Sequence, residues 1–208
     1  MYVPDWYHER NVTALHALIR AHAFAAMVTD VEGSPFASHL PFLLDSSRGA
    51  FGTLRAHMAR PNPQWLSFGN AREALIVFQG PHAYISPSWY EAQPAVPTWN
   101  YAVVHAYGVP LCVDEPALRE ILLATVAAFE TSGIARPLEE DYFDKMARGV
   151  VGFEIEITRL EGKLKLSQNR SEQDRLRVIE ALGKSDHEIE RDLADLMRVI
   201  ELPGADDK

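Results

Sequence analysis

Short apolar stretches separated by turn residues predict that most of this chain folds into β-strands. The stretches are 24–30, 35–44, 50–58, 74–79, 83–86, 98–113 and 149–166. In the last of them Phe153, Ile155 and Ile157 alternate with polar residues, which is the period of a half-buried strand. Turn residues at 32–34 are expected to join the first two strands into a hairpin.

Apolar residues at helical spacing predict helices between and after these strands. The predicted helices cover 11–22, 115–131 and 138–146, followed by a pair of helices after residue 170. The second helix carries one apolar stripe, made of Leu118, Ile121, Leu122, Thr125, Val126 and Phe129. In the tail, Ser171 and Ser185 each begin a capping box with an acidic residue three positions later, and Gly183 ends the first tail helix.

The order of these elements predicts an α+β, mainly β, protein: a β-barrel with peripheral helices and a C-terminal helical pair. Strands and helices do not alternate strictly, which argues against a doubly wound fold. Neither GxGxxG nor GxxxxGK[ST], the usual phosphate-binding loops, is present. We expect a barrel domain over 1–170, a helical extension over 171–202 and a frayed tail over 203–208.

The composition of the chain narrows the range of functions that it can have. The chain has 208 residues, 47% of them hydrophobic, and a net charge of -9, which argues against direct binding to a nucleic-acid backbone. No apolar run reaches the roughly 18 residues of a membrane span, and the N-terminus lacks a secretory pattern. Cys112 is the only cysteine, which excludes a disulfide framework, and its apolar neighbours predict a buried side chain. We expect a cytoplasmic protein without membrane contact.

The stretch 80–105, GPHAYISPSWYEAQPAVPTWNYAVVH, is unusually rich in aromatic rings with polar groups. Two apolar segments flank a loop at 91–97 that contains two prolines. Aromatic rings beside hydroxyl groups and an amide are typical of the wall of a pocket for a flat, polar ligand. The alternative is an aromatic-rich loop that only packs on the barrel beneath it.

A second candidate site lies in RAHMARPNPQW, where a strand is predicted to end. Arg60 can form two parallel hydrogen bonds to a phosphate, and His57 and Asn62 can add others. The end of a strand would hold these groups on a rigid scaffold. The alternative is a solvated turn with a surface arginine.

Histidines are frequent in the predicted barrel, at His39, His57, His82 and His105. Neutral imidazoles could bind zinc or haem iron, but no HxH, HxxxH or HExxH spacing links them, so we predict no metal site. His39 lies among apolar residues, where a lone histidine is more often a core or edge residue than a catalyst. Ser86, Ser88 and His105 suggest a hydrolase, but the chain lacks a GxSxG motif and an acid placed to orient a histidine.

Two further polar groups could contact a heterocycle. The first group consists of Thr98, Trp99 and Asn100. An amide can form a hydrogen bond with the edge of a ring while a neighbouring indole covers the face of that ring. The second is Lys163, Lys165, Gln168 and Asn169. The two lysines alternate along a predicted strand and so share one face, where they could meet an anion or the pyrimidine edge of a flavin. The alternative is a pair of solvent-facing lysines on an edge strand.

Several long motifs occur in an order that resembles the PaiB-like family of FMN-binding negative transcriptional regulators. They are MYVP, SHLPF, HMARPNPQW, GPHAYISPSWY, VPTWNYAVVHAYG and KLSQNRS, and the resemblance runs from Met1 to about Gly183. The resemblance implies a split β-barrel related in architecture to pyridoxamine-phosphate oxidase. It also implies a homodimer that holds FMN at the interface.

The resemblance also implies which residues contact FMN. His57, Arg60 and Asn62 would lie on the phosphate side, and His39 and Leu40 beside the isoalloxazine ring. The remaining candidates are Thr98, Trp99 and Asn100 in the wall of the site and Lys163, Gln168 and Asn169 on the tail side.

Regulation by direct DNA binding is doubtful from the charges. The tail at 171–200 has more acidic than basic residues, which favours a solvated or dimer-packing face and an indirect route or partner protein. We therefore expect a dimeric FMN-binding protein that senses redox state or a small ligand through the flavin. The alternatives are a flavin-dependent oxidoreductase and a haem-binding or haem-degrading split-barrel protein.

Overall fold

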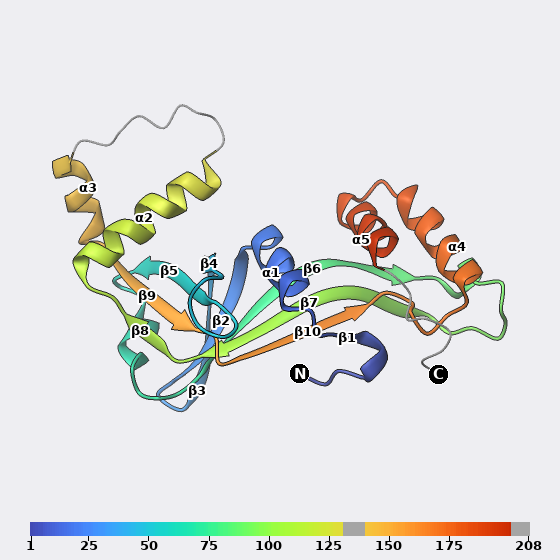
Figure 1. Ribbon diagram of the computed structural model, residues 1–208, viewed down its shortest axis with the longest axis horizontal. Coiled ribbons are helices and arrows are strands. Elements are labelled where there is room, and N and C mark those ends of the chain that lie inside the picture. The colour runs from blue at the N-terminus through green and yellow to red at the C-terminus, as the bar shows by residue number, and fades with distance from the viewer. Residues whose placement is uncertain (131–139, 201–208) are drawn as a thin grey trace. The chain divides into compact units, whose positions relative to one another are not determined.

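The computed structural model describes residues 1–130 and 140–200 and confirms a mainly β fold with peripheral helices and a C-terminal helical pair (Figure 1). The predicted helix end at 131, the helix start at 138 and the predicted tail at 203–208 lie outside the described residues. The strands are β1 His8–Glu9, β2 Phe24–Val31, β3 Ser34–Pro41, β4 Leu43–Asp45, β5 Thr53–Ala59, β6 Ala74–Ile85, β7 Thr98–Gly108, β8 Pro110–Cys112, β9 Val150–Glu156 and β10 Arg159–Lys165.

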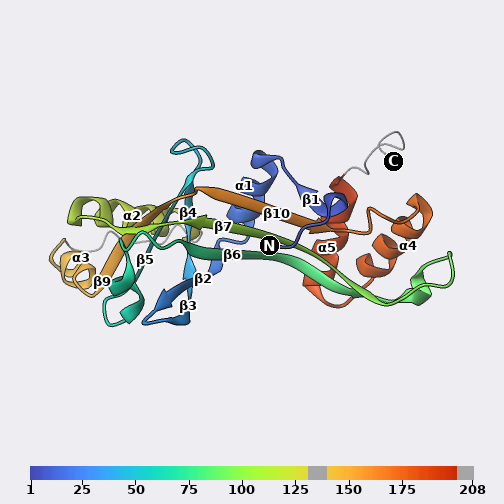
Figure 2. The ribbon, with the colours of Figure 1, turned by 90° about the horizontal axis from the view of Figure 1, so that it is seen from below.

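The helices lie where helical periodicity predicts them. They are α1 Val12–Ala21, α2 Glu115–Phe129, α3 Glu140–Ala147, α4 Glu172–Gly183 and α5 Glu188–Val199, with short 3-10 helices η1 Asp5–Tyr7, η2 Pro63–Ser67 and η3 Pro87–Trp89. The strands form a six-stranded sheet in the order β1-β10-β7-β6-β2-β3 and a four-stranded sheet in the order β4-β5-β9-β8. The predicted hairpin of β2 and β3 is confirmed (Figure 2). In its register Val31 lies opposite Ser34.

Three strands predicted as continuous are each two strands that belong to different sheets. The stretch 35–44 divides into β3 and β4, 98–113 into β7 and β8, and 149–166 into β9 and β10. At the first junction the Phe42 N–H donates to the Ala23 carbonyl at 2.9 Å. At the third, the Thr158 N–H donates to the Tyr107 carbonyl at 2.9 Å. At the first junction hydrophobic alternation continues without a break, so the sequence pattern does not reveal the change of sheet there.

Contacts along the chain define two compact units. Unit 1 comprises Met1–Asn11, Gln79–Val104 and Glu161–Lys208, and unit 2 comprises Val12–Phe78 and His105–Leu160. Strands β6, β7 and β10 therefore have residues in both units. The boundary expected at residue 170 separates a barrel domain from a helical extension that would each fold independently. The division into compact units does not measure independent folding, so this boundary stays a prediction.

The core of unit 2 is centred on aromatic rings beneath the four-stranded sheet. Phe153 on β9 is fully buried, and its ring makes edge-to-face contacts with Phe42 at 6.2 Å and Phe68 at 5.1 Å between centroids. Ile155 and Ile157 are also buried, which confirms the predicted alternation of this strand.

Helix α2 packs on β5 and β9 through only part of its predicted apolar stripe. Leu118 and Ile121 are buried, whereas Val126 and Phe129 are 49% and 48% exposed. The prediction that Cys112 is buried is wrong, because its side chain is exposed. Strand β8 pairs with β9 at the edge of the four-stranded sheet, so an apolar sequence there does not ensure burial.

In unit 1 the helices α4 and α5 pack against each other (Figure 1). The buried guanidinium of Arg175 on α4 donates through Nη2 to the carbonyl oxygens of Met197 and, at 2.8 Å, Ile200. The buried Asp174 accepts a hydrogen bond of 2.6 Å from the Glu91 N–H. Arg175 thus connects α4 to the end of α5, and Asp174 connects it to the loop after η3.

Of the two predicted capping boxes, one caps its helix in the structure and the other does not. Ser171 caps α4, and its Oγ accepts the Asp174 N–H at 3.1 Å, as predicted. The prediction for Ser185 is wrong, because α5 begins later and its N-cap is His187, which makes no side-chain cap. The Ser185 Oγ instead accepts the His187 N–H at 3.1 Å in the turn before the helix.

Ser171→Ala should therefore destabilise the protein more than Ser185→Ala. The first change removes a helix cap and should cost about 1 kcal/mol of unfolding free energy, because an N–H of α4 loses its acceptor. The second removes only a bond within a turn and should cost about half a kilocalorie per mole or less. Urea denaturation of both variants measures the difference. Equal losses would contradict the assignment of the caps.

Candidate functional site

The structure places the predicted cofactor residues in two groups, one in each unit. His39, Leu40, His57, Arg60 and Asn62 belong to unit 2. Thr98, Trp99, Asn100, Lys163, Gln168 and Asn169 belong to unit 1.

Arg60 follows the end of β5, and its side chain joins the turn to the start of β9. Its Nε donates to the Arg148 carbonyl and its Nη2 to the Val150 carbonyl, both at 2.8 Å. The Arg60 carbonyl in turn accepts the Trp65 Nε1–H at 2.8 Å. A cavity of about 570 Å³ opens here, and its lining includes Arg60, Trp65, Cys112 and Arg148. Arg60 therefore stabilises the turn while it also lines a cavity large enough for a small ligand.

Asn62 connects the two predicted motifs SHLPF and HMARPNPQW. Its Nδ2 donates to the Ser38 Oγ at 2.8 Å, and its Oδ1 caps η2 by accepting the Gln64 N–H at 3.0 Å. Ser38 precedes His39 on β3, so the bond brings the two motifs together. His39 is exposed and its ring stacks 6.3 Å from that of Phe24, whereas Leu40 is half-buried.

Gln64 is a buried polar residue that the sequence did not single out. Its Nε2 donates to the carbonyls of Met27 and Phe36, both at 3.2 Å, and to the Thr29 Oγ1 at 3.0 Å. The single signal for it is its position two residues after the cap residue Asn62. Gln64 holds η2 against the β2–β3 hairpin, which fixes the turn that carries Arg60 and Asn62.

His57 is half-buried on β5, opposite Gly152 of β9. Burial lowers the pKa of its imidazole, which favours the neutral form. Its Nδ1 is buried and finds no hydrogen-bond partner among the described residues. A buried polar atom without a partner is uncommon, and a water molecule or a ligand can supply the missing bond.

In unit 1 the two lysines of β10 are directed to neighbouring strands and the N-terminal segment. The Lys165 Nζ donates to the Thr98 Oγ1 and, at 2.8 Å, to the Trp99 carbonyl. The Lys163 Nζ donates to the Tyr2 carbonyl at 3.1 Å and lies 5.4 Å from the centre of the Tyr101 ring. Burial, and then the charge of Lys163, lowers the pKa of Lys165. These contacts exclude the alternative of freely solvated lysines.

Asn100 follows Trp99 on β7, so its side chain points to the face opposite that of Trp99 and does not join this group. It is 1% exposed, and its Nδ2 donates to the Ser167 Oγ at 2.9 Å on the inner face. Gln168 closes the turn after β10, where its Oε1 accepts the Leu166 N–H at 2.7 Å and its Nε2 donates to the Leu164 carbonyl at 2.5 Å. Asn169 is exposed. The structure thus brings Thr98, Trp99, Lys163 and Lys165 together and separates Asn100 from them.

Trp99 belongs to an aromatic cluster on the outer face of β6 and β7. Its ring lies 6.2 Å from that of His82 and 6.2 Å from that of Tyr84. The indole is 53% exposed and Tyr84 45% exposed. Rings from the predicted aromatic stretch therefore lie together on one face, although Tyr90 from the same stretch is buried under Arg170. Their role as the wall of a ligand pocket stays a prediction.

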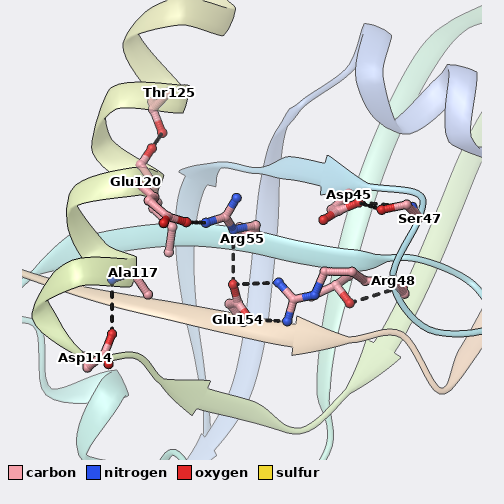
Figure 3. Close-up of polar contacts among 11 residues, drawn as sticks. Asp45, Ser47, Arg48, Arg55, Asp114, Ala117, Glu120, Thr125 and Glu154 are labelled. Carbon is pink, nitrogen blue, oxygen red and sulfur yellow. Dashed lines mark hydrogen bonds and ion pairs between the residues drawn. The ribbon is translucent and has the colours of Figure 1, made fainter.

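An ion-pair cluster on the four-stranded sheet is a second feature absent from the sequence predictions (Figure 3). Glu154 on β9 accepts two hydrogen bonds from Arg48, at 2.9 and 2.7 Å, and one of 3.1 Å from Arg55. Arg55 also pairs with Glu120 of α2 at 3.4 Å. The partners are far apart in sequence, and nothing in their local spacing indicates the contact. The hydrogen bond from Arg48, and then the two arginine charges, lowers the pKa of Glu154 against the opposing effect of burial.

This cluster predicts how acid affects the fold. A carboxyl whose pKa is lowered by folding stabilises the protein fully above its unfolded pKa, about 4.3, and this stabilisation is lost as the pH falls through the lower folded pKa. Glu154→Gln should cost about 1 kcal/mol at neutral pH. Its Tm should then fall less steeply than that of the wild type below about pH 4.3. Glu156→Gln, an exposed position on the same strand, is the matched control. Parallel Tm curves for wild type and Glu154→Gln would contradict the prediction.

The described residues contain no group of three or more His, Cys, Asp and Glu side chains arranged to hold a metal ion. Within the same residues, no helix has the length and apolar character needed to cross a bilayer.

Solved structures identify the fold as that of the flavin-binding split-barrel proteins. The FAD and heme binding protein from Mycobacterium smegmatis is 14% identical with a TM-score of 0.62, covering 82% of this chain and 78% of that protein. The flavocytochrome Anf3 from Azotobacter vinelandii is 16% identical with a TM-score of 0.62, covering 84% and 78%. At these identities the likeness establishes the fold alone.

Sequence comparison identifies the family. Residues 1–159 match the family model described as "Putative FMN-binding domain". The "Protease synthase and sporulation protein PAI 2" of Bacillus subtilis is 34% identical over 201 residues, covering 95% of this chain and 96% of that protein. An uncharacterized protein of Emericella nidulans, AN0679, is 28% identical over 242 residues with the same coverage. The chain belongs to this FMN-binding family, is PaiB-like, and has FMN as its cofactor.

Proposed function

We propose that this protein is a cytoplasmic, homodimeric FMN-binding regulator of the PaiB type, whose flavin senses redox state or a small ligand. The observation that carries the proposal is the end-to-end match to the Bacillus subtilis relative, whose name refers to protease synthesis and sporulation. When bound, FMN supplies reversible electron transfer and visible absorbance.

Each residue group, taken within its own unit, has chemistry that fits one part of FMN. In unit 2, the cavity beside Arg60 offers an arginine to a phosphate, while the partnerless Nδ1 of His57 offers another polar contact. In unit 1, the exposed indole of Trp99 offers a flat surface for a ring, and the lysines beside it offer positive charge. We assign His39, Leu40 and Thr98 to the margins of these surfaces. Asn62 supports the turn of Arg60 in unit 2, Asn100 and Gln168 support the strands of unit 1, and Asn169 stays a candidate contact.

The exposed aromatic cluster of unit 1 supports dimerisation. His82, Tyr84, Trp99 and the half-buried Tyr101 and Val103 occupy neighbouring positions on β6 and β7. Aromatic residues are enriched in protein interfaces, where they provide large contact areas. A second copy of the chain is the partner that the family resemblance implies for this face.

The C-terminal helical pair favours indirect regulation over DNA contact. Each of its arginines already has a partner within unit 1: Arg175 the carbonyls of Met197 and Ile200, Arg177 the carboxylate of Glu91, Arg191 the carbonyl of Ser185 and Arg198 the carboxylate of Asp195. DNA binding requires arginines and lysines that are free to neutralise phosphates. We therefore assign regulation to a partner protein or small ligand.

The absorbance spectrum of the purified protein from about 300 to 600 nm, before and after FMN addition and desalting, tests the proposal. We expect flavin bands to remain after desalting and light scattering to give a dimer mass. Arg60→Ala should lower FMN retention, because it removes a cation from the cavity, whereas Arg72→Ala removes an exposed arginine paired with Asp30 and should not. A spectrum without flavin after titration with FMN would overturn the proposal.

A further inference from the structure

Two buried or half-buried lysines alternate along β10, and neither forms an ion pair with a described carboxylate. Lys163 is 9% exposed and Lys165 is half-buried. Their hydrogen-bond acceptors are the Tyr2 carbonyl for Lys163, and the Thr98 hydroxyl and Trp99 carbonyl for Lys165. No described Asp or Glu forms an ion pair with either lysine.

Such an arrangement is costly unless negative charge is supplied from outside the chain. Removing an ammonium group from water is unfavourable, and neutral carbonyl and hydroxyl oxygens compensate only part of that cost. The two positive charges also repel each other. Paired cations without counter-ions in a desolvated setting are therefore characteristic of sites that receive an anion.

The neighbours of the lysines indicate the shape of that anion. Lys165 bonds the backbone of Trp99, whose indole is 53% exposed, and the Lys163 Nζ lies 5.4 Å from the centre of the Tyr101 ring. Aromatic surfaces suit a flat ring more than a compact, strongly hydrated ion such as phosphate. The ligand that fits best is a flat heterocycle with negative charge along one edge.

We propose that Lys165, supported by Lys163, stabilises the negative charge that FMN acquires at its N1–C2 edge on reduction, so that the protein binds reduced FMN more tightly than oxidised FMN. The inference rests on the proposed function, because it requires FMN to bind. Thr98 is the positioning residue, since its hydroxyl accepts a hydrogen bond from the Lys165 ammonium. A protein that holds reduced FMN more tightly raises the reduction potential of the flavin.

The midpoint potential of bound FMN and its dissociation constants in both redox states test the proposal. Dithionite supplies two electrons and water one proton, which convert oxidised FMN into the reduced anion. In Lys165→Met, we expect affinity for reduced FMN to fall about tenfold more than affinity for oxidised FMN, because one charge-assisted contact is lost. For a two-electron couple this corresponds to a midpoint potential lower by roughly 30 mV. Lys163→Met should shift the potential in the same direction.

Two control variants separate charge from structure. Lys165→Arg keeps the positive charge and should keep most of the wild-type potential. Lys184→Met removes an exposed lysine that pairs with Glu180 on α4 and should leave the potential unchanged. Tm values for all variants show whether each one is folded. If Lys165→Met unfolds, the other two variants still test the proposal. A wild-type potential in Lys165→Arg together with a lower potential in Lys163→Met would then support the role of charge.

Riboflavin lacks the phosphate of FMN, so it distinguishes lysines that contact the flavin ring from lysines that bind the phosphate. If Lys165→Met weakens FMN but not riboflavin and leaves the potential unchanged, the lysines bind the phosphate and the proposal is wrong. An unchanged potential with unchanged affinities also overturns it. A wild-type protein that binds no FMN would overturn the proposed function itself, and this inference with it.

Discussion

Replacing Phe153 by alanine should lower the free energy of unfolding by about 3–5 kcal/mol. The side chain is fully buried on β9, and its ring contacts those of Phe42 and Phe68 edge to face. The substitution removes these contacts and leaves a cavity that the packed strands can fill only in part. Urea denaturation followed by circular dichroism measures the loss.

Phe129→Ala is the matched control for this prediction. It makes the same chemical change on α2, where the phenylalanine is 48% exposed. Its cost should stay below about 1 kcal/mol, because little buried surface is lost. If the two variants lose equal stability, Phe153 does not have the central packing role that the ring contacts indicate.

Arg175→Met should be the most damaging change in the helical pair. It leaves the carbonyls of Met197 and Ile200 without their donor and should cost about 1–3 kcal/mol. Because these carbonyls lie at the end of α5, amide hydrogen exchange should accelerate in that helix first.

The neighbouring Arg177→Met provides the comparison. Arg177 lies on the same helix, is exposed and pairs with Glu91 at 3.2 Å. An exposed ion pair of this kind contributes about 0–1 kcal/mol. Faster exchange in α5 for both variants alike would show that Arg175 does not specifically hold the end of that helix.

The sequence predicts the type and position of most elements because their patterns are local. Alternation identifies β9 from Phe153, Ile155 and Ile157, and a serine three residues before an acid identifies the start of α4. It does not predict where a strand leaves one sheet for the other, as at Phe42. That change depends on a partner strand far along the chain, and the hydrophobic pattern continues unaltered across it.

The same limit applies to the candidate site. Residue type and motif single out Trp99 and Lys165, and the structure brings them together. Strand geometry directs the adjacent Asn100 to the opposite face, a consequence of alternation that the motif TWNY does not indicate when read as one unit. The buried bonds of Gln64 and the ion pairs of Glu154 join distant segments, so no local pattern indicates their partners, although the position of Gln64 after the cap residue Asn62 is a local signal for the residue itself.

The exposed position of Cys112 makes the unmodified chain suitable for site-specific spectroscopy. The chain has no other thiol, so a maleimide-linked nitroxide would attach at one place, on β8 of unit 2. A homodimer would carry two such labels and give a single intermolecular distance by dipolar electron paramagnetic resonance, whereas a monomer would give none. Because Cys112 also lines the cavity beside Arg60, the mobility of the same label would show directly whether FMN enters that cavity.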